Sequence, residues 1–468
     1  MFQIQNKSGD ASPWLLYPAD NKTVWIVTVK FGRPLVSQIV NFDISSEQST
    51  PVVNLTNSVP TDILYDHTSK LVWIVENDSL AYYDQARNKF NIALTFPNGA
   101  PQYLAVDSQD HFWLTLLGTD QIVEYFPATA NLYNYSTPTS NAGLQGIAVS
   151  PVDGSVWFAE AYAGKIGHLT PCGTPLCPIT EYSSPPWIGL RGVIQLAVDG
   201  KGTVWFTNHD GNEFGSFDPS TGDWKLFPIG YCPDSYVQSC DVGLPNAIAL
   251  DPAGQVWFSE HFSGRIGRYD PNNQALIEYT MPTNSAVCSK GCTPYSWWMW
   301  PGQDNLVWFV AFGLGEIGYV NSTVPVPFSV APLTSVTINH GSSTSLPIRV
   351  AYSGEAPAIN ASATSQDTSP IPSTISLSVG PVRESTNGIE TSTITITAAW
   401  SSASGPRYVA VTAYNENLTV NAFVRVEVVA SIEYTTLGIV SGISAFSAFT
   451  VGINQYSKRR NGRTKSTV

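Results

Sequence analysis

Charged residues are scarce in this chain of 468 residues: Asp, Glu, Lys and Arg make up 13% of it, and acidic residues outnumber basic ones by 36 to 23. The formal net charge of −13 argues against binding to the phosphate backbone of nucleic acid, which needs a basic surface. Five of the basic residues lie in the last eleven positions, 458–468, where acidic residues are absent. The acidic body and the basic end are therefore expected to lie in different environments.

Charge is absent altogether from residues 434–457, which directly precede the basic end. The centre of this segment, LGIVSGISAFSAFTVGI, is long enough to span a bilayer; a buried strand or helix is the alternative interpretation. The neighbouring basic cluster favours the membrane. Because positively charged flanks stay on the cytoplasmic side, we expect one transmembrane helix over 434–457, a cytoplasmic tail over 458–468 and an extracellular part over 1–433.

Cysteine is also rare, and its six copies form three close pairs: Cys172 and Cys177, Cys232 and Cys240, and Cys288 and Cys292. An even number of cysteines in short loops indicates disulfides that form outside the cell. Zinc ligation is the alternative, but these spacings lack the usual zinc knuckle and no His is clustered with them. We expect one local disulfide in each loop, although a bridge between the second and third loops stays open.

Acceptor sequons for N-glycosylation occur eight times before the uncharged segment and not once after it, which agrees with an extracellular body. The acceptor candidates are Asn6, Asn21, Asn54, Asn77, Asn134, Asn321, Asn360 and Asn417. No signal peptide precedes Met1–Gln5, which itself has the pattern of a strand, so we expect a signal upstream of this segment.

The most informative feature is a short sequence motif that ends in tryptophan. It occurs seven times in the first 320 residues, at Trp25, Trp73, Trp113, Trp157, Trp205, Trp257 and Trp308. Successive copies are 40 to 52 residues apart, the period of a four-stranded propeller blade. Each copy predicts a strand A, a tight turn, a strand B that carries the tryptophan, and strands C and D. One such sheet cannot bury both faces, so the copies are expected to stack radially into a closed ring.

The sequence therefore predicts an all-β protein with a seven-bladed β-propeller over residues 1–324, whose last blade is completed by the N-terminal FQIQ. A Pro-rich linker is expected over 325–332. Residues 333–430 lack the repeat and contain about six short alternating runs, which predict a small immunoglobulin-like β-sandwich. Its expected role is that of a stalk between the propeller and the membrane.

The phrases VWFAE…GKIGHLTP…ITEY and VWFSE…GRIGRYDP…IEY resemble the streptogramin B lyase (virginiamycin B lyase) family, and the resemblance extends over residues 1–320. It implies a seven-bladed propeller. It also implies, for the family, the opening of a cyclic depsipeptide lactone by magnesium-assisted elimination.

The residues that the family uses for this reaction are not found at the corresponding positions of this chain. The His that opens strand A of the family's last blade corresponds to Tyr295, and the His of the blade before it corresponds to Asn246. The expected acids correspond to Thr293 and to Ala311 or Phe312. A tyrosine of ordinary pKa is a poor general base at neutral pH. The family's lyase reaction is therefore not expected here.

Strand A begins and strand B ends on the same face of a propeller, which we call the candidate face. We interpret it as a binding face with no assigned catalytic or metal-ligating residue, and its expected members are Trp14, Glu160, Tyr162, Asn208, His209, Asn246, Glu260, His261, Tyr295 and Phe312. As alternatives, the glutamates cap backbone N–H groups, and the two histidines bond solvent or share a metal. The aspartates that open the tight turns, Asp107, Asp199 and Asp251, are interpreted as turn formers rather than metal ligands.

These observations favour a membrane-anchored extracellular recognition protein whose propeller binds a glycan, a peptide or an envelope protein. The aromatic run SWWMW (296–300) supports this function, because its outward side chains offer a flat stacking surface. One alternative is a divergent metal-assisted lyase or lactone hydrolase that uses Glu160, Glu260, His209 and His261. Another is a structural component of a cell envelope. No cofactor is expected, and magnesium is implied only for the enzyme.

The expected orientation predicts that protease added to intact cells releases a fragment of the size of the propeller, because residues 1–433 face outward. Immunoblotting of the medium against a propeller epitope measures this release. A propeller that is cleaved only after lysis would show the opposite orientation.

Overall fold

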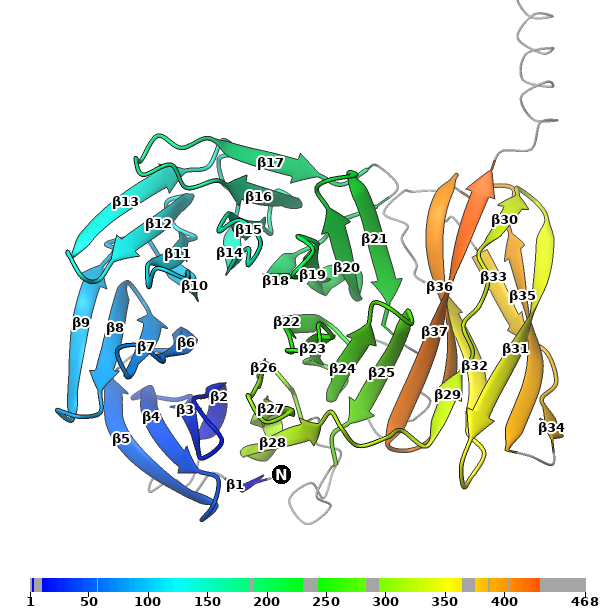
Figure 1. The fold of residues 1–468 in the computed structure, drawn as a ribbon, viewed down its shortest axis with the longest axis horizontal. Helices are drawn as coiled ribbons and strands as arrows, with labels where there is room; N and C mark the ends of the chain where they lie inside the picture. Colours follow the sequence, from blue (N-terminus) through cyan, green and yellow to red (C-terminus); the bar gives the residue numbers. More distant parts are fainter. Residues whose placement is uncertain are drawn as a thin grey trace, which may run out of the picture.

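The chain folds as an all-β protein in which strands are joined by turns. The computed structural model describes residues 2–3, 11–56, 58–185, 188–229, 243–282, 294–363, 375–385, 388–402 and 404–429. Helical structure in this part of the chain consists of two short 3-10 turns, η1 (His209–Gly211) and η2 (Phe312–Leu314). Figure 1 shows antiparallel sheets placed radially around a central axis, which is the arrangement of a β-propeller.

Six sheets of the ring follow the order of the chain, each with its first strand innermost (Figure 1). The first three sheets contain β2 (Ser12–Pro18), β3 (Thr23–Lys30), β4 (Val36–Asp43) and β5 (Gln48–Thr56); β6 (Pro60–Asp66), β7 (Leu71–Glu76), β8 (Ser79–Asp84) and β9 (Lys89–Thr95); and β10 (Pro101–Val106), β11 (Phe112–Leu116), β12 (Gln121–Phe126) and β13 (Asn131–Ser136). The next three contain β14 (Leu144–Val149), β15 (Val156–Glu160), β16 (Lys165–Leu169) and β17 (Ile179–Ser183); β18 (Val193–Val198), β19 (Val204–Asn208), β20 (Glu213–Asp218) and β21 (Asp223–Pro228); and β22 (Pro245–Leu250), β23 (Val256–Glu260), β24 (Arg265–Asp270) and β25 (Ala275–Thr280).

The last sheet of the ring is assembled from both ends of this region. It contains β26 (Met299–Pro301), β27 (Leu306–Ala311), β28 (Glu316–Asn321) and the N-terminal β1 (Phe2–Gln3), with Phe2 opposite Ile317. Strand β1 therefore covers the edge of β28 and joins the two ends of the ring.

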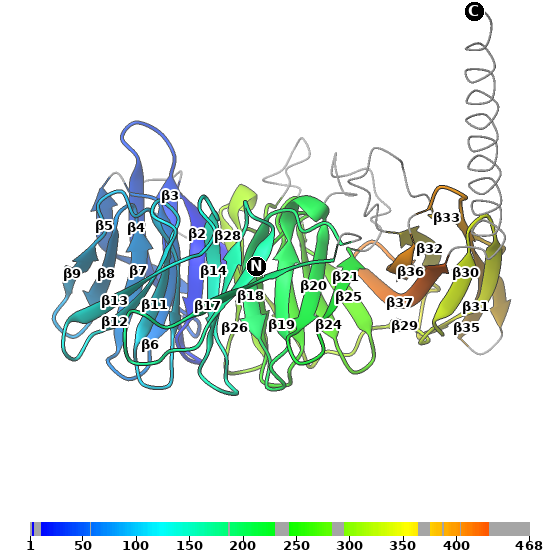
Figure 2. The ribbon, with the colours of Figure 1, turned by 90° about the horizontal axis from the view of Figure 1, so that it is seen from above.

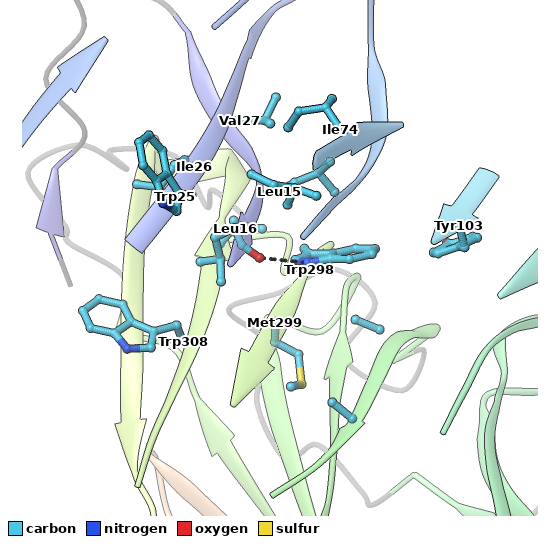
Figure 3. Packing of buried hydrophobic residues seen from close by; sticks show 14 of the residues in the cluster. Leu15, Leu16, Trp25, Ile26, Val27, Ile74, Tyr103, Trp298, Met299 and Trp308 are labelled. Carbon is cyan, nitrogen blue, oxygen red and sulfur yellow. Dashed lines mark hydrogen bonds between the residues drawn. The ribbon is translucent and has the colours of Figure 1, made fainter. Parts of the chain in front are cut away.

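A second link between the first and last sheets lies in the buried core. Figure 3 shows Trp298, directly before β26, beside Leu15 and Leu16 of β2. The indole N–H of Trp298 donates to the backbone oxygen of Leu16 at 3.1 Å, and the ring stacks on Tyr103 of β10 with 6.0 Å between centroids. Trp298 is only 1% exposed, so this indole closes the ring from inside.

The repeated tryptophans form the core of the sheets: each of the seven is at most 5% exposed. The turn before strand B supplies a partner for the indole N–H. Trp205 donates to Oδ2 of Asp199 at 3.0 Å, while Oδ1 of Asp199 accepts the backbone N–H groups of Lys201 and Thr203. One aspartate thus shapes the turn and satisfies the buried indole, which explains why the two residue types recur six positions apart.

Strand C approaches strand B too closely for any side chain at one position. Gly267 in β24 pairs with Phe258 in β23, and a Cβ atom on Gly267 would lie 2.3 Å from the Phe258 ring. The equivalent pair Gly167 and Phe158 in β16 and β15 leaves 2.0 Å. Glycine at this position of strand C therefore leaves room for the phenylalanine ring of strand B.

After the ring, the chain forms two sheets that share an apolar core. One contains β29 (Phe328–Val330), β31 (Ser343–Tyr352), β33 (Ile375–Val379), β34 (Arg383–Ser385) and β35 (Ile389–Ala398); the other contains β30 (Val336–Asn339), β32 (Ala358–Ala363), β36 (Gly405–Tyr414) and β37 (Leu418–Val429). We call β29–β37 the C-terminal unit. Strand β29 lies within 325–332, so this segment, expected as a linker, contributes a strand.

The C-terminal unit is attached to the ring by a pair of strands. Strand β37 pairs antiparallel with β25, from Leu418 opposite Tyr279 to Ala422 opposite Ala275, and the two units share an eight-stranded sheet. Figure 2 shows the C-terminal unit beside the rim of the ring. The unit expected as a stalk is thus hydrogen-bonded to the outer edge of one propeller sheet.

No helix in the part of the chain that the structure describes is long and apolar enough to cross a membrane. The expected transmembrane helix over 434–457 and the tail over 458–468 lie outside the described residues. The same holds for the cysteines of the second and third pairs, Cys232, Cys240, Cys288 and Cys292. Cys172 and Cys177 are described and form a disulfide.

The close approach of strands B and C predicts that Gly267→Ala lowers the free energy of unfolding by about 1–3 kcal/mol, because the added methyl group collides with the Phe258 ring. Urea unfolding of the full chain measures the change. Gly200→Ala is the matched control, since a Cβ there meets nothing within 4 Å. Equal losses in both variants would contradict the role of this contact.

Candidate functional site

Two tryptophans from the first and last sheets stack on each other at the candidate face. Trp14 in β2 and Trp297, just before β26, have ring centroids 5.2 Å apart and planes inclined by 18°. Phe312 meets Trp14 edge-on at 5.6 Å, and Phe31, which follows β3 and is 54% exposed, does so at 5.7 Å. Trp14 is anchored because its indole N–H donates to the backbone oxygen of Pro60 at 2.9 Å.

Two histidines continue this cluster toward the neighbouring sheets. The His261 ring meets Trp297 edge-on at 5.2 Å and stacks on His209 at 5.0 Å with planes inclined by 15°. We call His209, His261, Trp297, Trp14, Phe31 and Phe312 the aromatic row. It runs across four sheets from β19 to β3, and its six rings come from places where a strand A begins or a strand B ends.

An oxygen atom lies within hydrogen-bond distance of Nδ1 in each of the two histidines of the row. Nδ1 of His261 lies 2.9 Å from the backbone oxygen of Leu244, and Nδ1 of His209 lies 2.7 Å from Oδ1 of Asp210. Burial, followed by the charge of His209, lowers the pKa of His261 to about 4, so its imidazole is neutral at pH 7. Within the described residues no third ligand joins these two rings in a metal-binding group.

The two glutamates at the ends of strands B are buried but differ in their partners. Glu260 is held by Arg265, whose Nε and Nη2 each lie 2.8 Å from Oε2. Lys165 takes the place of Arg265 in the sheet of Glu160, yet its Nζ contacts Glu181 at 2.6 Å. Both oxygens of Glu160 lack a hydrogen-bond partner among the described residues. The guanidinium of an arginine such as Arg265 can donate to two acceptors at once, whereas the ammonium of Lys165 pairs with the carboxylate of Glu181.

Burial is the main cause that raises the pKa of Glu160 to about 8, and the charge of Glu181 adds to it. Glu160 is 0% exposed and so holds a proton at neutral pH. Neither Glu160 nor Glu260 accepts a backbone N–H within the described chain, so the described residues give no support to the alternative that they cap main-chain groups. The repeat brings both carboxyl groups to the same place in their sheets, and the choice of Lys or Arg decides their charge.

The two predicted asparagines position the main chain rather than presenting free amides. Nδ2 of Asn246 donates to the backbone oxygen of Trp297 at 2.9 Å and so fixes the segment that carries the stacked indole. Asn208 accepts the backbone N–H of Arg191 and donates to Glu213 at 2.9 Å. Asn208 and Asn246 are at most 1% exposed, so they support the candidate face from below.

The two predicted tyrosines are exposed. Tyr162 is 72% exposed and covers Gly143, where a Cβ would lie 2.3 Å from its ring. Tyr295 is 36% exposed and contacts Phe262, whose ring centroid is 5.7 Å away and which follows His261 in the chain. The structure thus places Tyr295 beside the aromatic row, where its backbone oxygen accepts the N–H of Phe312 at 3.1 Å, and shows no ring contact between Tyr162 and the row.

Two members of the row, Trp297 and Phe31, were not among the predicted site residues. The run SWWMW indicated that some of its rings face outward, but alternation alone does not tell Trp297 from Trp298. Only the register of β26 against β27 turns Trp298 into the core. Phe31 carried no motif, although it directly follows the strand B of the first repeat.

The described residues of the candidate face do not fit a magnesium ion, which prefers several oxygen ligands in octahedral geometry. Thr293 lies outside the described residues, and Ala311 has no ligand atom in its side chain. The amide of Asn246 is occupied by Trp297, and Glu260 is neutralised by Arg265. We therefore derive no catalytic step through this metal.

These features define a β-propeller whose candidate face carries a row of rings, with its carboxyl groups buried beneath. The chain belongs to the Virginiamycin B lyase family, whose model matches residues 52–326. The resemblance seen in the repeats is thereby confirmed. No curated protein matches the chain.

Two solved structures share the fold. One is selenomethionine-substituted virginiamycin B lyase from Staphylococcus aureus: it is 20% identical with a TM-score of 0.55, and the match covers 68% of this chain and 97% of that chain. The other is a catalytically inactive His-to-Ala variant of virginiamycin B lyase from Staphylococcus aureus with quinupristin, with a TM-score of 0.54 at the same identity and coverage. At this identity, the likeness establishes the fold alone.

The unpaired carboxyl group predicts a pH-dependent effect of Glu160→Gln. Folded Glu160 keeps its proton up to a pKa of about 8, while the unfolded chain loses it near the ordinary value of 4.5. Between these values the wild-type protein loses roughly 1.4 kcal/mol of stability per pH unit through this group, whereas glutamine does not titrate. The free energy of unfolding of the variant, relative to that of the wild type, should therefore increase as pH rises from 5 to 8.

Urea unfolding at pH 5, 6.5 and 8 checks this, with Glu260→Gln as the matched control. Removal of the charge that pairs with Arg265 should destabilise the protein at all three values. A difference between Glu160→Gln and wild type that does not change with pH would show that Glu160 is ionised in the folded protein.

Proposed function

We propose that this protein is a surface recognition protein that binds a peptide-type ligand with apolar or aromatic side chains through the aromatic row. A C-terminal helix over 434–457 anchors it in the cell membrane, with the propeller outside. It lacks the lyase reaction of its family. The single observation that carries this proposal is the stack of Trp14 on Trp297, flanked by Phe31 and Phe312, at the candidate face.

Rings of this kind give binding energy at low entropic cost. Tryptophan and phenylalanine have two rotatable side-chain bonds, and those of the row are held by each other and by the bond from Trp14 to Pro60. Preorganised aromatic clusters are where binding energy concentrates in protein interfaces. With His261 neutral, the centre of the row carries no charge that a ligand would have to desolvate.

A peptide is favoured as ligand because the family resemblance implies a cyclic depsipeptide as substrate, and one family member is seen with quinupristin. A glycan would also stack on Trp14 and Trp297, but the two asparagines predicted at this face, Asn208 and Asn246, are buried and engaged. We therefore place the glycan, and the role of an envelope component, second to the peptide.

One observation favours an enzyme as the runner-up. His209 and His261 stack at 5.0 Å, and the neutral imidazole of His261 is available to accept a proton. A base with a pKa of about 4 is weak, however, and Glu260 is bound to Arg265 while Glu160 is buried as the neutral acid. The described residues do not assemble these four groups into an acid and base pair.

The proposed location agrees with the acceptor asparagines. Six of them are exposed, and Asn360 is half-buried, while Asn6 lies outside the described residues: the exposed ones are Asn21, Asn54, Asn77, Asn134, Asn321 and Asn417. Exposure leaves these amides accessible to glycosylation outside the cell. The strand pair of β25 and β37 joins the propeller to the C-terminal unit, which precedes the proposed anchor in the chain.

The proposal predicts that the purified full chain binds quinupristin and leaves its ring intact. Trp297→Ala should weaken this binding at least about tenfold, because it removes the central ring of the row. Calorimetric titration measures the affinity, and mass spectrometry of the recovered probe detects any linear product. Trp400→Ala is the control, since Trp400 is 59% exposed on the C-terminal unit.

Equal affinities of Trp297→Ala and wild type would show that the row is not the binding site. Ring opening that disappears in His261→Ala would establish the enzyme instead. Binding to members of a glycan panel but not to quinupristin would show that the ligand is a glycan and not a peptide.

A further inference from the structure

Three polar side chains converge in the third sheet of the ring, on the face opposite the candidate face. Asp107 follows β10, His111 directly precedes β11, and Glu124 lies in β12. One potential ligand atom from each lies within 4.8 Å of the others, and no other such group of three occurs among the described residues. We propose that Asp107, His111 and Glu124 bind a divalent transition-metal ion.

The distances suit a shared ion. Nδ1 of His111 lies 3.3 Å from Oδ2 of Asp107 and 3.5 Å from Oε1 of Glu124. Ligands at about 2.0–2.2 Å from a tetrahedral ion are themselves roughly 3.3–3.6 Å apart. A charge-assisted hydrogen bond between these groups would be shorter, at about 2.7–2.9 Å. The distances from the imidazole nitrogen to the two carboxylate oxygens therefore match those between ligands of one metal ion.

Buried aromatic donors hold both carboxylates from behind. The indole N–H of Trp113 donates to Oδ2 of Asp107 at 3.1 Å, and the hydroxyl of Tyr135 donates to Oε2 of Glu124 at 2.6 Å. Both rings are fully buried. Outer partners of this kind orient the ligands of a metal site before the ion arrives. They leave Oε1 of Glu124 directed at His111.

The neighbouring repeats show that the turn itself does not need this cluster. Asp199 and Asp251 hold the same turn and the same indole at 3.0 and 2.9 Å. The places of His111 and Glu124 are taken there by other side chains: Thr203 and Ser216 in the fifth sheet, and Gln255 and Arg268 in the sixth. We therefore assign Asp107 a role in this cluster in addition to its role in the turn.

The donor set selects the kind of ion. One imidazole nitrogen and two carboxylate oxygens suit Zn²⁺ or Mn²⁺, whereas magnesium and calcium prefer oxygen alone. Two carboxylates and a neutral imidazole carry a charge of −2, which such an ion neutralises. The His111 side chain is 23% exposed, so the ion can enter and a water can complete the coordination.

The test is a calorimetric titration of the purified full chain, without a polyhistidine tag and after treatment with a chelator, with ZnCl2 and MnCl2. We expect one ion per chain and a rise in melting temperature. His111→Gln should weaken binding at least about 100-fold. Tyr135→Phe, which keeps the ring and removes only the outer hydrogen bond, should weaken it about tenfold.

Asp199→Asn is the control, because it disturbs the equivalent turn where the other ligands are missing, and it should bind the ion like wild type. Circular dichroism confirms that each variant is folded. Equal affinity of wild type and His111→Gln would overturn the site. So would a wild-type protein that binds neither ion.

Discussion

The structure depends on one constraint: no sheet of the ring can bury both of its faces by itself. Each sheet therefore packs against two neighbours, and the tryptophans of strands B fill the space between them. Polar side chains reinforce this packing from one sheet to the next. Thr115 donates to the backbone oxygen of Gln145 at 2.6 Å, and Gln195 accepts the backbone N–H of Ile248 at 2.8 Å. A ring so joined must also close, which β1 and Trp298 accomplish.

Because the ring is held by this repeated core, the ends of the strands are free to differ. Glu160, Asn208 and Glu260 occupy the same position at the end of strand B, yet one is a neutral acid, one supports a loop and one is half of an ion pair. The opposite ends show the same freedom, since Glu124 and Arg268 occupy equivalent positions. The side chains at the strand ends can therefore differ from sheet to sheet while the fold stays the same.

The C-terminal unit applies the same principle to an exposed edge. The outer strand of a propeller sheet presents unpaired main-chain groups, and β37 covers those of β25. A buried polar contact accompanies the pairing, because Nδ2 of Asn421 donates to Glu278 at 2.7 Å across the junction. Burial raises the pKa of Glu278 to about 8, and this amide gives its carboxyl group a partner.

The sequence by itself determined the family, the period of the sheets and the burial of the repeated tryptophans, because each repeat carries its own turn and strand signals within about 50 residues. Only the tertiary structure decided which ring of SWWMW reaches the candidate face, which carboxyl group lacks a partner, and which sheet continues into β37. These outcomes depend on strand register and on contacts between residues far apart in the chain, such as Trp14 with Trp297 and Glu278 with Asn421. Local spacing carries no information about them, since the same repeat permits several partners.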